Sequence, residues 1–516
     1  MIKYFYCVLF STLVYSIDPI VIKGSKFFNK NTNEQFFFKG VDYQPRQHDS
    51  RSNLDPLSEN DACLRDVKLL KELNVNSIRV YETDYTLNHD VCMKALADAG
   101  IYVMLDIATP NYSINREAPT WDDDLYTHFK KKVDAFIGYP NVIAFLIGNE
   151  VTNDKNTTPA SAFVKAALRD MKTYLKAKKS SIYIGYADND DEIIRYSLIK
   201  YFNCGDDPMA RVDFYGVNTY RWCGDKVTYE TSGYASMAEP FQDYSVPVLL
   251  TEYGCNTARP RTFNEVAAVY SDKMTGIFSG GFIYEYSQED NDYGLVKIDN
   301  GNAKKLDDFM YLKKQYAVKP STDVTLSNYV PTGKIADCPP VAPDWKVSPR
   351  SLPPTPVSSF CNCVNDSLKC SVNRPKGSIP KEQGKSLGKV FDYICGTMPC
   401  NETLTNTETG SYGSISFCDP VVKAGFLINK KFIMDNENPA SCSFNSLELS
   451  INKSPSINDI AACSKFNKDS DLSNISSNKK DSDQKNTKKS AANLLSSHYC
   501  SFVAPIILVA ISVILC

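Results

Sequence analysis

The chain has few of the residues that bind metals. It has only four histidines among 516 residues, His48, His89, His128 and His498, and no two cysteines are spaced as Cys-x-x-Cys. Because zinc sites use these side chains, the sequence predicts no metal site. A phosphate-binding glycine pattern is missing as well: no Gly-x-Gly-x-x-Gly follows the first expected strand, and the GKS fragment at 384–386 lacks its leading glycine. We therefore expect no cofactor.

An excess of charge of either sign is also missing. The chain has 57 Lys and Arg residues against 60 Asp and Glu residues, for a net charge of -3. Nucleic-acid binding depends on basic side chains that neutralise phosphates. The balanced charge gives no electrostatic reason to expect nucleic acid or an acidic polymer as a partner. An uncharged ligand fits this composition better.

Both ends of the chain have the features of targeting signals. Residues 1–16 have one basic residue, Lys3, before an apolar stretch and small residues at the cleavage spacing, which predicts a secretory signal peptide; the run is too short to span a membrane comfortably. Residues 502–516 are apolar to the last residue, and small residues lie at 490–492. This pattern predicts a GPI-anchor signal over 491–516 that is removed during attachment. A plain C-terminal membrane helix is the alternative.

The cysteines and sequons fit an extracellular protein. Without Cys7, Cys500 and Cys516 in the processed ends, fourteen cysteines remain, an even number suited to disulfides in an oxidising compartment. An Asn-x-Ser/Thr acceptor would carry sugar if the chain enters the secretory pathway. The six acceptors are Asn111, Asn156, Asn365, Asn401, Asn452 and Asn474.

A proline-rich segment divides the chain. Residues 338–356 have too much proline for a helix or a central strand and predict a semi-rigid linker, placed at 341–358. Residues 17–340 are long enough for one large barrel domain. Residues 359–464 hold eight cysteines, a density typical of a small module held by disulfides rather than by core burial. Residues 465–490 have almost nothing apolar and predict a disordered stalk.

Apolar β-rich runs alternate with helix-like stretches before the linker. The stretches at 61–73 and 161–175 carry apolar residues at helical spacing. Such alternation, with right-handed crossovers, favours an α/β fold closed into a (β/α)8 barrel. An open doubly wound sheet is the alternative. The expected strands are residues 36–44, 75–82, 101–108, 142–150, 182–188, 213–220, 247–254 and 281–287.

Two of these strands end on a glutamate. Glu150 closes the fourth expected strand and Glu252 lies near the end of the seventh, where barrel enzymes carry their catalytic residues. Breaking a glycosidic bond needs one carboxyl group to protonate the leaving oxygen and one to meet the positive charge at the sugar carbon. A separation of about 5 Å gives retention, and a wider gap gives inversion. A structural ion pair is the alternative for a single glutamate, but two at equivalent strand ends favour glycoside chemistry.

Longer motifs carry a family resemblance over nearly the whole mature chain. The motifs are GVDYQP, DACLRD, IRVY, ALADAGIYVMLDIATP, GNEVTND, RVDFYGVNTYRWCG, TEYGCN, PRTFNEV and FSGGFIYEYSQEDNDYGLV. In these the chain resembles the fungal cell-wall β-1,3-glucanosyltransferases of glycoside hydrolase family seventy-two. The cysteine-rich module resembles the family forty-three type of carbohydrate-binding module that a subset of them carries.

The resemblance implies an activity. Such an enzyme cuts inside a β-1,3-glucan donor, keeps the new reducing end as a covalent ester, and transfers it with retention to the non-reducing end of a β-1,3-glucan acceptor. We expect a monomer that elongates cell-wall glucan. We also expect it at the outer face of the plasma membrane, held there by its GPI anchor, and in the cell wall.

The resemblance also implies roles for single residues. Glu150 would be the acid/base, Glu252 the nucleophile, and Asn149 would hold the 2-hydroxyl of the sugar; a strand-end cap is the alternative for Asn149. Glu285 and Glu289 would have structural or subsite roles, because neither closes a strand opposite Glu150. The motifs that line the cleft contain Gln44, Tyr81, Asp106, Asn218, Tyr220 and Tyr284, and the tyrosines would orient the nucleophile or stack on sugar rings.

By the same resemblance, three disulfides should form in the barrel. They are Cys63–Cys92, Cys204–Cys338 and Cys223–Cys255, and the last would tie the loop after Tyr220 to the loop after Glu252. The chain departs from the family pattern at 46–48, where RQH replaces the usual glycines, and at Arg221, where an acidic residue is common. They leave the glutamates untouched, but the family pattern does not predict donor binding near the first loop or specificity around the cleft for this chain.

Two other functions fit parts of the pattern. A retaining endo-β-1,3-glucanase would use the same residues and differ only in whether water or a second glucan resolves the ester. A wall-anchored glucan-binding protein with an inactive barrel would use the cysteine-rich module. The intact glutamates argue against the second function.

Overall fold

The structure is a computed structural model that describes residues 17–45, 55–373, 381–444, 447–455 and 460–466. The expected signal peptide, the anchor signal, almost all of the stalk, Asn474 and the departure at 46–48 lie outside the described residues. Contacts group the chain up to Asp469 into one compact unit. The predicted domain limits therefore stay a prediction.

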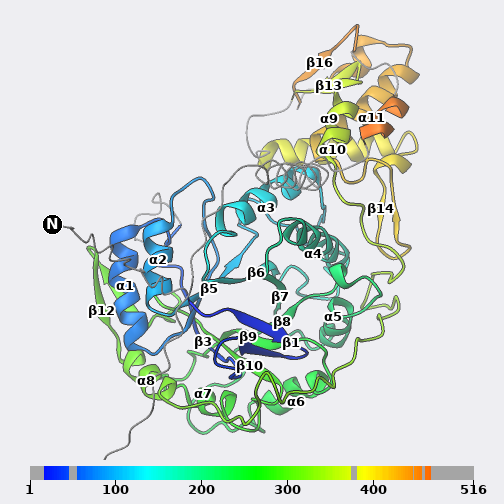
Figure 1. The fold of residues 1–516 in the computed structure, drawn as a ribbon. Helices are drawn as coiled ribbons and strands as arrows, with labels where there is room; N and C mark the ends of the chain where they lie inside the picture. Colours follow the sequence, from blue (N-terminus) through cyan, green and yellow to red (C-terminus); the bar gives the residue numbers. More distant parts are fainter. Residues whose placement is uncertain (1–16, 46–54, 374–380, 445–446, 456–459, 467–516) are drawn as a thin grey trace, which may run out of the picture. The chain divides into compact units, whose positions relative to one another are not determined.

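Eight parallel strands form the centre of the fold (Figure 1). They are β3 (Phe38–Asp42), β4 (Ser77–Val80), β5 (Tyr102–Asp106), β6 (Val142–Asn149), β7 (Tyr183–Asp188), β8 (Phe214–Asn218), β9 (Val248–Tyr253) and β10 (Phe278–Ile283). The ring closes in the order β10-β3-β4-β5-β6-β7-β8-β9. The (β/α)8 prediction is confirmed, and the open-sheet alternative is wrong.

The last barrel strand begins earlier than expected, at Phe278 instead of residue 281. Two glycines explain the difference. A Cβ on Gly280, which has φ of +85°, would lie 2.3 Å from the Phe38 carbonyl oxygen, and one on Gly281 would lie 2.3 Å from that of Leu250. Only glycine lets β10 approach both neighbours, although a glycine pair reads as a break in a strand. The strand also ends earlier than expected, at Ile283 instead of residue 287, so Tyr284 follows it.

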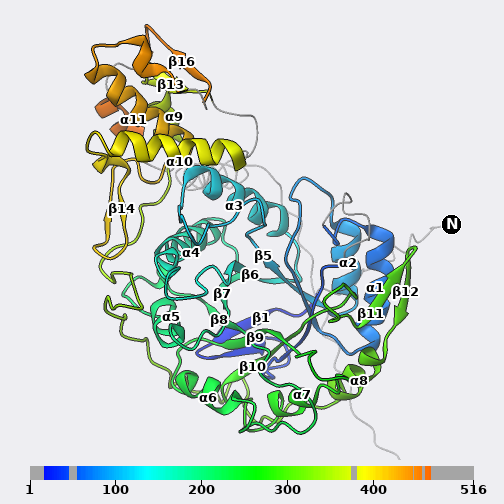
Figure 2. The same ribbon diagram turned by 180° about the vertical axis from the view of Figure 1, so that it is seen from behind.

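Helices follow the barrel strands and cover their outer faces (Figure 2). The expected helices at 61–73 and 161–175 are confirmed as α1 and α4, within two residues at each end. The helices are α1 (Asn60–Glu72), α2 (Asp90–Asp98), α3 (Asp123–Phe136), α4 (Ala160–Ala177), α5 (Arg195–Phe202), α6 (Tyr234–Ala238), α7 (Asn264–Val269) and α8 (Asp307–Tyr316), with 3-10 turns at η1 (Pro208–Ala210) and η2 (Glu239–Phe241). A hairpin of β11 (Val296–Asp299) and β12 (Asn302–Lys305) precedes α8. Within the described residues, no helix has both the length and the apolar character needed to cross a membrane.

A second hairpin closes the N-terminal end of the barrel. It consists of β1 (Ile20–Lys23) and β2 (Lys26–Asn29), which pair antiparallel. Phe27 on β2 is fully buried and its ring lies 5.0 Å from that of Phe38, the first residue of β3. Its core cluster also contains residues near the starts of other strands, such as Phe214. The opposite, C-terminal end is therefore the one that remains for a functional site.

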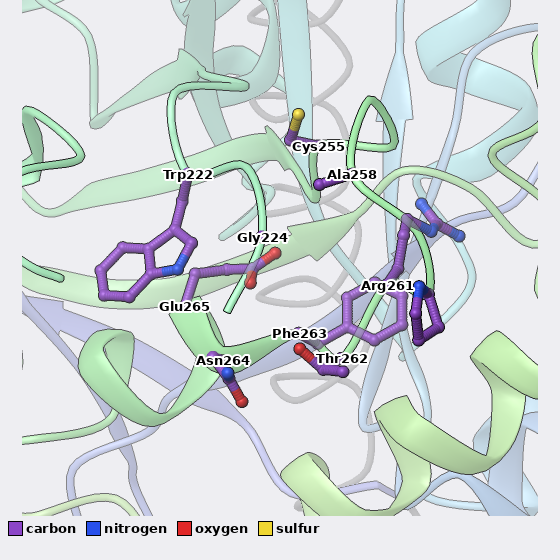
Figure 3. A pocket seen from close by; sticks show the side chains of 10 residues that line it. Trp222, Gly224, Cys255, Ala258, Arg261, Thr262, Phe263, Asn264 and Glu265 are labelled. Atoms are coloured by element: carbon purple, nitrogen blue, oxygen red, sulfur yellow. The ribbon is translucent and has the colours of Figure 1, made fainter. Parts of the chain in front are cut away.

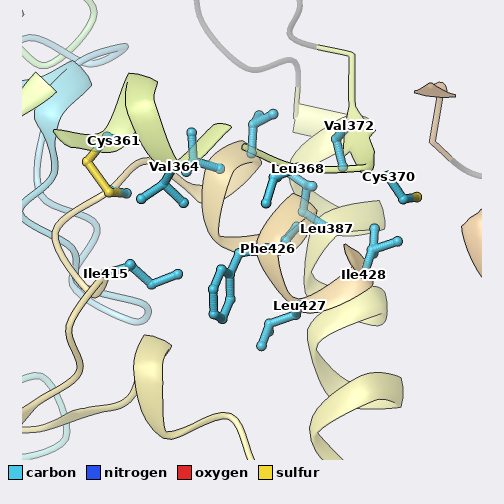
Figure 4. Close-up of a cluster of buried hydrophobic side chains, with 14 of the residues drawn as sticks. Cys361, Val364, Leu368, Cys370, Val372, Leu387, Ile415, Phe426, Leu427 and Ile428 are labelled. Carbon is cyan, nitrogen blue, oxygen red and sulfur yellow. A yellow bond between two sulfur atoms is a disulfide. The ribbon is translucent and has the colours of Figure 1, made fainter. Parts of the chain in front are cut away.

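The cysteine-rich module has a hydrophobic core as well as disulfides (Figure 4). Its elements are α9 (Ser358–Asp366), β13 (Cys370–Val372), α10 (Lys381–Cys395), η3 (Asn401–Thr403), β14 (Thr405–Asn406), β15 (Ser411–Tyr412), α11 (Pro420–Met434), η4 (Pro439–Cys442), β16 (Leu449–Ile451) and η5 (Ile460–Phe466). The disulfides are Cys361–Cys418, Cys363–Cys463, Cys370–Cys442 and Cys395–Cys400. Helix α11 is buried on most of its faces and packs with Val364 and Leu368. The expectation that disulfides replace a core is therefore wrong, because the apolar run in α11 builds one.

The proline-rich segment has no helix or strand between residues 341 and 357, as predicted, but it is packed against the barrel. Trp345 is fully buried and its ring lies 5.3 Å from that of Tyr201. Arg169 on α4 donates to the Pro353 carbonyl at 3.0 Å, and Thr355 donates to Asp170 at 2.7 Å. These contacts hold the segment to α4, so it is not a free spacer.

Candidate active site

The two glutamates lie at the C-terminal ends of β6 and β9. Glu252 is on β9 and is 8% exposed, whereas Glu150 directly follows β6. Glu150 has φ of +48°, a left-handed conformation that is uncommon for residues with a Cβ. Its amide donates to the Ala187 carbonyl at 2.9 Å, and Arg116 donates to the Glu150 carbonyl at 2.8 Å. These bonds hold the strained strand end in place.

Three donors converge on the Glu252 carboxylate. Oε1 accepts a hydrogen bond from the Tyr81 hydroxyl at 2.9 Å and from Arg79 Nη1 at 3.1 Å. Oε2 accepts one from the Tyr220 hydroxyl at 2.7 Å. Hydrogen bonds to a carboxylate favour its ionised form. Both oxygens of Glu252 are therefore oriented, and its negative charge is stabilised.

Arg79 organises the centre of the site. It is on β4, is fully buried, and makes five hydrogen bonds with its five N–H groups. Nε and Nη2 bind the two oxygens of Asp106 at 3.0 and 2.9 Å. Nη2 also binds Asn149 Oδ1 at 2.8 Å, and Nη1 binds Glu252 and the Thr251 carbonyl. One guanidinium group therefore connects three strand ends.

A short chain of amides links Glu150 to the same guanidinium. Asn218 Nδ2 donates to Glu150 Oε1 at 2.8 Å and to Asn149 Oδ1 at 3.0 Å. The Thr251 hydroxyl donates to Asn218 Oδ1 at 2.8 Å, which fixes the orientation of that amide. Because Asn149 also binds Arg79, hydrogen bonds run without a gap from Glu150 to Glu252. The structure therefore brings the two glutamates into one site.

The charges of the site act on each other. Burial is the largest influence on Glu252 and leaves its pKa above the usual value, although Arg79 and the hydrogen bonds from Tyr220 and Tyr81 lower it; the charge of Glu150 raises it. Burial, followed by nearby carboxylates, also raises the pKa of Tyr81 and of Tyr220 well above the usual tyrosine value. Both hydroxyls therefore stay protonated and can only serve Glu252 as donors.

Tyrosine rings surround Glu252. The ring of Tyr284 meets those of Tyr81 and Tyr220 edge to face, at centroid distances of 6.5 and 6.1 Å. Tyr293, from the loop after β10, lies 5.1 Å from Tyr284 and 5.5 Å from Tyr220. Such rings offer apolar faces of the kind on which sugars stack, with polar edges. All four are half-buried, so they form a wall that is partly open to solvent.

The other predicted site residues lie in or beside this network. Asp106 is 5% exposed and pairs with Arg79. Gln44 Oε1 accepts from the amides of Tyr81 and Glu82 at 3.1 and 2.9 Å. Gln44 therefore holds the loop that carries Tyr81. Every side chain predicted for the cleft is within this group or contacts it.

Glu285, Glu289 and Arg221 lie outside the hydrogen-bond chain that joins the two catalytic candidates. Glu285 is 3% exposed and accepts from Asn291 at 2.9 Å, while Glu289 is half-buried in the loop after β10. Arg221 pairs with Asp190 at 2.6 Å. Arg195 pairs with the other oxygen of the same carboxylate, at 2.7 Å. Arg221 therefore links the loops after β7 and β8.

The three barrel disulfides implied by the resemblance are present: Cys63–Cys92, Cys204–Cys338 and Cys223–Cys255. Beside the last one, the loops after β8 and β9 line a small pocket that includes Trp222 and Arg261 (Figure 3). Arg261 donates to the Tyr284 carbonyl at 2.9 Å and to the Tyr293 carbonyl. The pocket wall therefore supports two rings of the site. Among the described residues, no group of three or more His, Cys, Asp or Glu has the arrangement of a metal site.

The sequence reasoning missed Arg79, Asp42 and Tyr293. Arg79 lies in the quoted IRVY motif, and a charged residue inside a buried strand was the signal that could have found it. Asp42 gave a similar signal at the end of the first barrel strand, where it is 0% exposed. Tyr293 lies within the quoted motif at 278–296, but as one of 31 tyrosines it had no feature of its own that marked it.

Comparisons with known proteins identify the family of the chain. A sequence profile described as "Glucanosyltransferase", of glycoside hydrolase family 72, matches residues 10–319, and one described as "X8 domain" matches residues 369–449. The 1,3-beta-glucanosyltransferase of Arthroderma benhamiae is 44% identical over 446 residues, 82% of this chain and 80% of that protein. The 1,3-beta-glucanosyltransferase GAS2 of Saccharomyces cerevisiae is 41% identical over 450 residues, 84% of this chain and 80% of that protein.

A solved structure shares the fold. It is that of Saccharomyces cerevisiae Gas2p in complex with laminaripentaose, which has a TM-score of 0.78 and 39% identity and covers 85% of this chain and 98% of that chain. The profile match spans more than half of the chain, and the relatives cover most of it. The chain belongs to the glucanosyltransferases of glycoside hydrolase family 72.

Proposed function

We propose that this enzyme transfers β-1,3-glucan with retention, with Glu252 as the nucleophile and Glu150 as the general acid and base. In the first half, Glu252 attacks the anomeric carbon while Glu150 gives its proton to the leaving oxygen, so a glycosyl ester forms and a shorter glucan leaves. In the second half, Glu150 takes the proton of an acceptor hydroxyl, the oxygen attacks the same carbon, and Glu252 is released.

The hydrogen-bond chain from Glu150 to Glu252 carries this proposal. Glu252 has three donors, including a guanidinium, which favour the ionised form that a nucleophile needs. Glu150 has one amide donor, from Asn218, and is half-buried at the mouth of the barrel. Glu150 therefore lacks the guanidinium and the tyrosine hydroxyls that stabilise a negative charge on Glu252. This difference supports the assignment of the two roles.

The names of the relatives support the substrate. Relatives in Arthroderma and Saccharomyces are named 1,3-beta-glucanosyltransferases, and one solved relative holds laminaripentaose. Asn149 accepts hydrogen bonds from Arg79 and Asn218 and would meet a sugar hydroxyl next to Glu252. The half-buried rings of Tyr81, Tyr220, Tyr284 and Tyr293 would flank the sugars on either side of the cleavage point.

Product analysis tests the transfer. Purified enzyme is incubated with one reduced β-1,3-oligosaccharide, and the products are separated by chain length. We expect products longer than the starting chain. Only shorter products would mean that water resolves the ester, and no products would mean that the protein only binds glucan.

Two amide substitutions test the residues. Glu150→Gln and Glu252→Gln should each abolish turnover without changing thermal unfolding. Glu265→Gln is the matched control, because Glu265 is 5% exposed, as buried as Glu252, but lies outside the hydrogen-bond chain. Appreciable activity in either of the first two variants, or loss of activity in the control, would contradict the assignment.

Azide distinguishes the two roles. With an activated glycosyl donor, Glu150→Ala should still form the ester, and azide should then resolve it to a β-glycosyl azide. In Glu252→Ala, azide should replace the nucleophile and give the α-glycosyl azide. The reverse pattern of products would mean that the roles are exchanged.

The location of the protein is part of the same proposal. The ends of the chain support a signal peptide at 1–16 and a GPI anchor signal at 491–516, with the catalytic domain at 17–340 and a carbohydrate-binding module at 359–464. The enzyme would act as a monomer at the cell surface. Phosphatidylinositol-specific phospholipase C should release it from intact cells, and sedimentation of the released protein should give the mass of one chain. Retention on the membrane after this treatment would favour a C-terminal helix.

A further inference from the structure

Asp42 is a buried carboxyl group beside the nucleophile that the mechanism above does not use. It is the last residue of β3, and its partner in the ladder with β4 is Arg79. Side chains of paired residues point to the same face of a sheet. Both are 0% exposed, so Asp42 lies inside the barrel with the guanidinium that binds Glu252.

Asp42 has no hydrogen bond of its own through its carboxyl group. Within the part of the chain that the structure describes, neither Oδ1 nor Oδ2 has a partner. Arg79 acts on it electrostatically, but all five of its N–H groups are already used by Asp106, Glu252, Asn149 and the Thr251 carbonyl. Burying a carboxylate without hydrogen bonds is costly, and the neutral acid is favoured instead.

The charges around Asp42 point the same way. Arg79 is the cation of this group, and it already pairs with both Asp106 and Glu252, so an ionised Asp42 would add a further unbalanced negative charge. Burial raises the pKa of Asp42 well above its usual value, Arg79 lowers it, and Glu252, Asp106 and Glu285 raise it again. The titratable groups that face it are Arg79 and Tyr81 from β4 and its loop, Asp106 from β5, Tyr220 after β8, Glu252 from β9, Tyr284 and Glu285 after β10, and Tyr316 from α8.

We propose that Asp42 is a positioning residue that stays protonated while Glu252 is ionised, so that the one negative charge the two share stays on the nucleophile. The inference rests on the proposed role of Glu252. Two interacting carboxyl groups titrate as a pair, and the proton that remains goes to the group with the weaker support for its charge. Arg79, Tyr81 and Tyr220 all donate to Glu252 and none donates to Asp42. The donors therefore decide which of the two carries the charge.

The pH profile of Asp42→Asn tests this, because asparagine resembles the neutral acid in shape and charge. We expect kcat/KM at its plateau to stay within about tenfold of the wild type, with the acid limb unmoved. If Asp42 were ionised in the working enzyme, removing its charge would lower the pKa of Glu252. The acid limb would then move down by about half a pH unit or more, which would overturn the proposal. A larger loss of activity in a folded variant would overturn it too.

Infrared difference spectra of the enzyme without substrate give a second readout. The spectrum of the wild type minus that of Asp42→Asn, both recorded at the pH of the activity plateau, should show the C=O stretch of a protonated carboxylic acid. Asp170→Asn is the matched control: Asp170 is 3% exposed but pairs with Arg169, so its loss should remove carboxylate bands. Carboxylate bands for Asp42 would refute the proposal. If the asparagine variant does not fold, Asp42→Ser provides the same difference.

The two proposals can fail separately. Substantial turnover by Glu252→Gln would remove the proposed nucleophile, whatever the spectrum of Asp42 shows. An inactive Glu252→Gln together with an ionised Asp42 would leave the mechanism intact and refute only the inference about the shared charge.

Discussion

Arg79→Lys is the sharpest test of how the site is organised. Lysine keeps the positive charge but has three N–H groups in place of five and lacks the planar fork. Arg79 uses all five in the structure, two of them on Asp106 and one each on Glu252, Asn149 and the Thr251 carbonyl. At least two of these hydrogen bonds must be lost in the variant.

The size of the effect follows from those bonds. A hydrogen bond to a charged group contributes about 1.5–3 kcal/mol, so losing two costs about 3–6 kcal/mol. If that cost falls on the transition state, kcat/KM drops about 10²- to 10⁴-fold, since about 1.4 kcal/mol corresponds to a factor of ten. The pKa of Glu252 should also rise, because Arg79 is the strongest influence that lowers it. The acid limb of the pH profile should therefore move to higher pH.

Initial rates of transfer between β-1,3-oligosaccharides, measured across pH, provide the assay. Arg169→Lys is the matched control: Arg169 on α4 binds Asp170 and the Pro353 carbonyl, outside the hydrogen bonds that link the two glutamates, so this variant should keep its activity. Thermal unfolding establishes that both variants fold. A loss of less than about tenfold in Arg79→Lys, or an acid limb that stays in place, would refute the view that this guanidinium holds the nucleophile.

Three further predictions concern single side chains. Tyr81→Phe and Tyr220→Phe should each lower kcat about 10- to 150-fold, because each removes a hydrogen bond of about 1.5–3 kcal/mol to Glu252. Both variants should also move the acid limb of the pH profile to higher pH. An unchanged pH profile would contradict this prediction. Burial raises the pKa of Glu265 to about 7, so ionisation of Glu265 destabilises the fold as pH rises from about 4.5 to about 7. In denaturant titrations over that range, the free energy of unfolding of Glu265→Gln should rise by on the order of 3 kcal/mol relative to the wild type. An equal pH dependence of stability in the two proteins would exclude this effect. Trp345→Ala should cost about 3–5 kcal/mol of local packing and expose the proline-rich segment to proteases, and cleavage at the wild-type rate would show that the segment is not held by this ring.

The barrel could be predicted because its strands have a recognisable sequence pattern. All eight expected runs became strands, since a buried parallel strand is apolar along its length and is bounded by polar turns. The exception in position was β10, where Gly280 and Gly281 serve the close approach of neighbouring strands, a reason visible only in three dimensions. The core of the module was missed for a related reason. The cysteine density dominated the interpretation, although the apolar run of α11 was present.

The sequence motifs predicted which residues belong to the site but not which partners each side chain contacts. Glu150 and Glu252 follow from strand ends, and Tyr81 and Tyr220 follow from the resemblance. The partners of each side chain depend on which strands meet around the ring. Arg79 on β4 reaches Glu252 on β9, 173 positions later in the chain, and no local pattern contains that contact. Asp42 is significant only because the donors of Arg79 are already used elsewhere.

Transfer and hydrolysis differ in a way that the two glutamates cannot decide. In transfer between β-1,3-glucans, the bond formed is of the same kind as the bond broken, so the second half is nearly the reverse of the first. In the proposed mechanism, Glu150 and Glu252 serve both directions equally, and they would serve a water molecule in the same manner. Selectivity for an acceptor must then come from what occupies the space beside the ester. We expect the half-buried rings of Tyr284 and Tyr293 to flank that space, because both contact Tyr220, which binds Glu252; Arg261 holds the backbone carbonyls of both tyrosines. Loosening this wall should therefore raise hydrolysis at the expense of transfer without altering the chemistry of either glutamate.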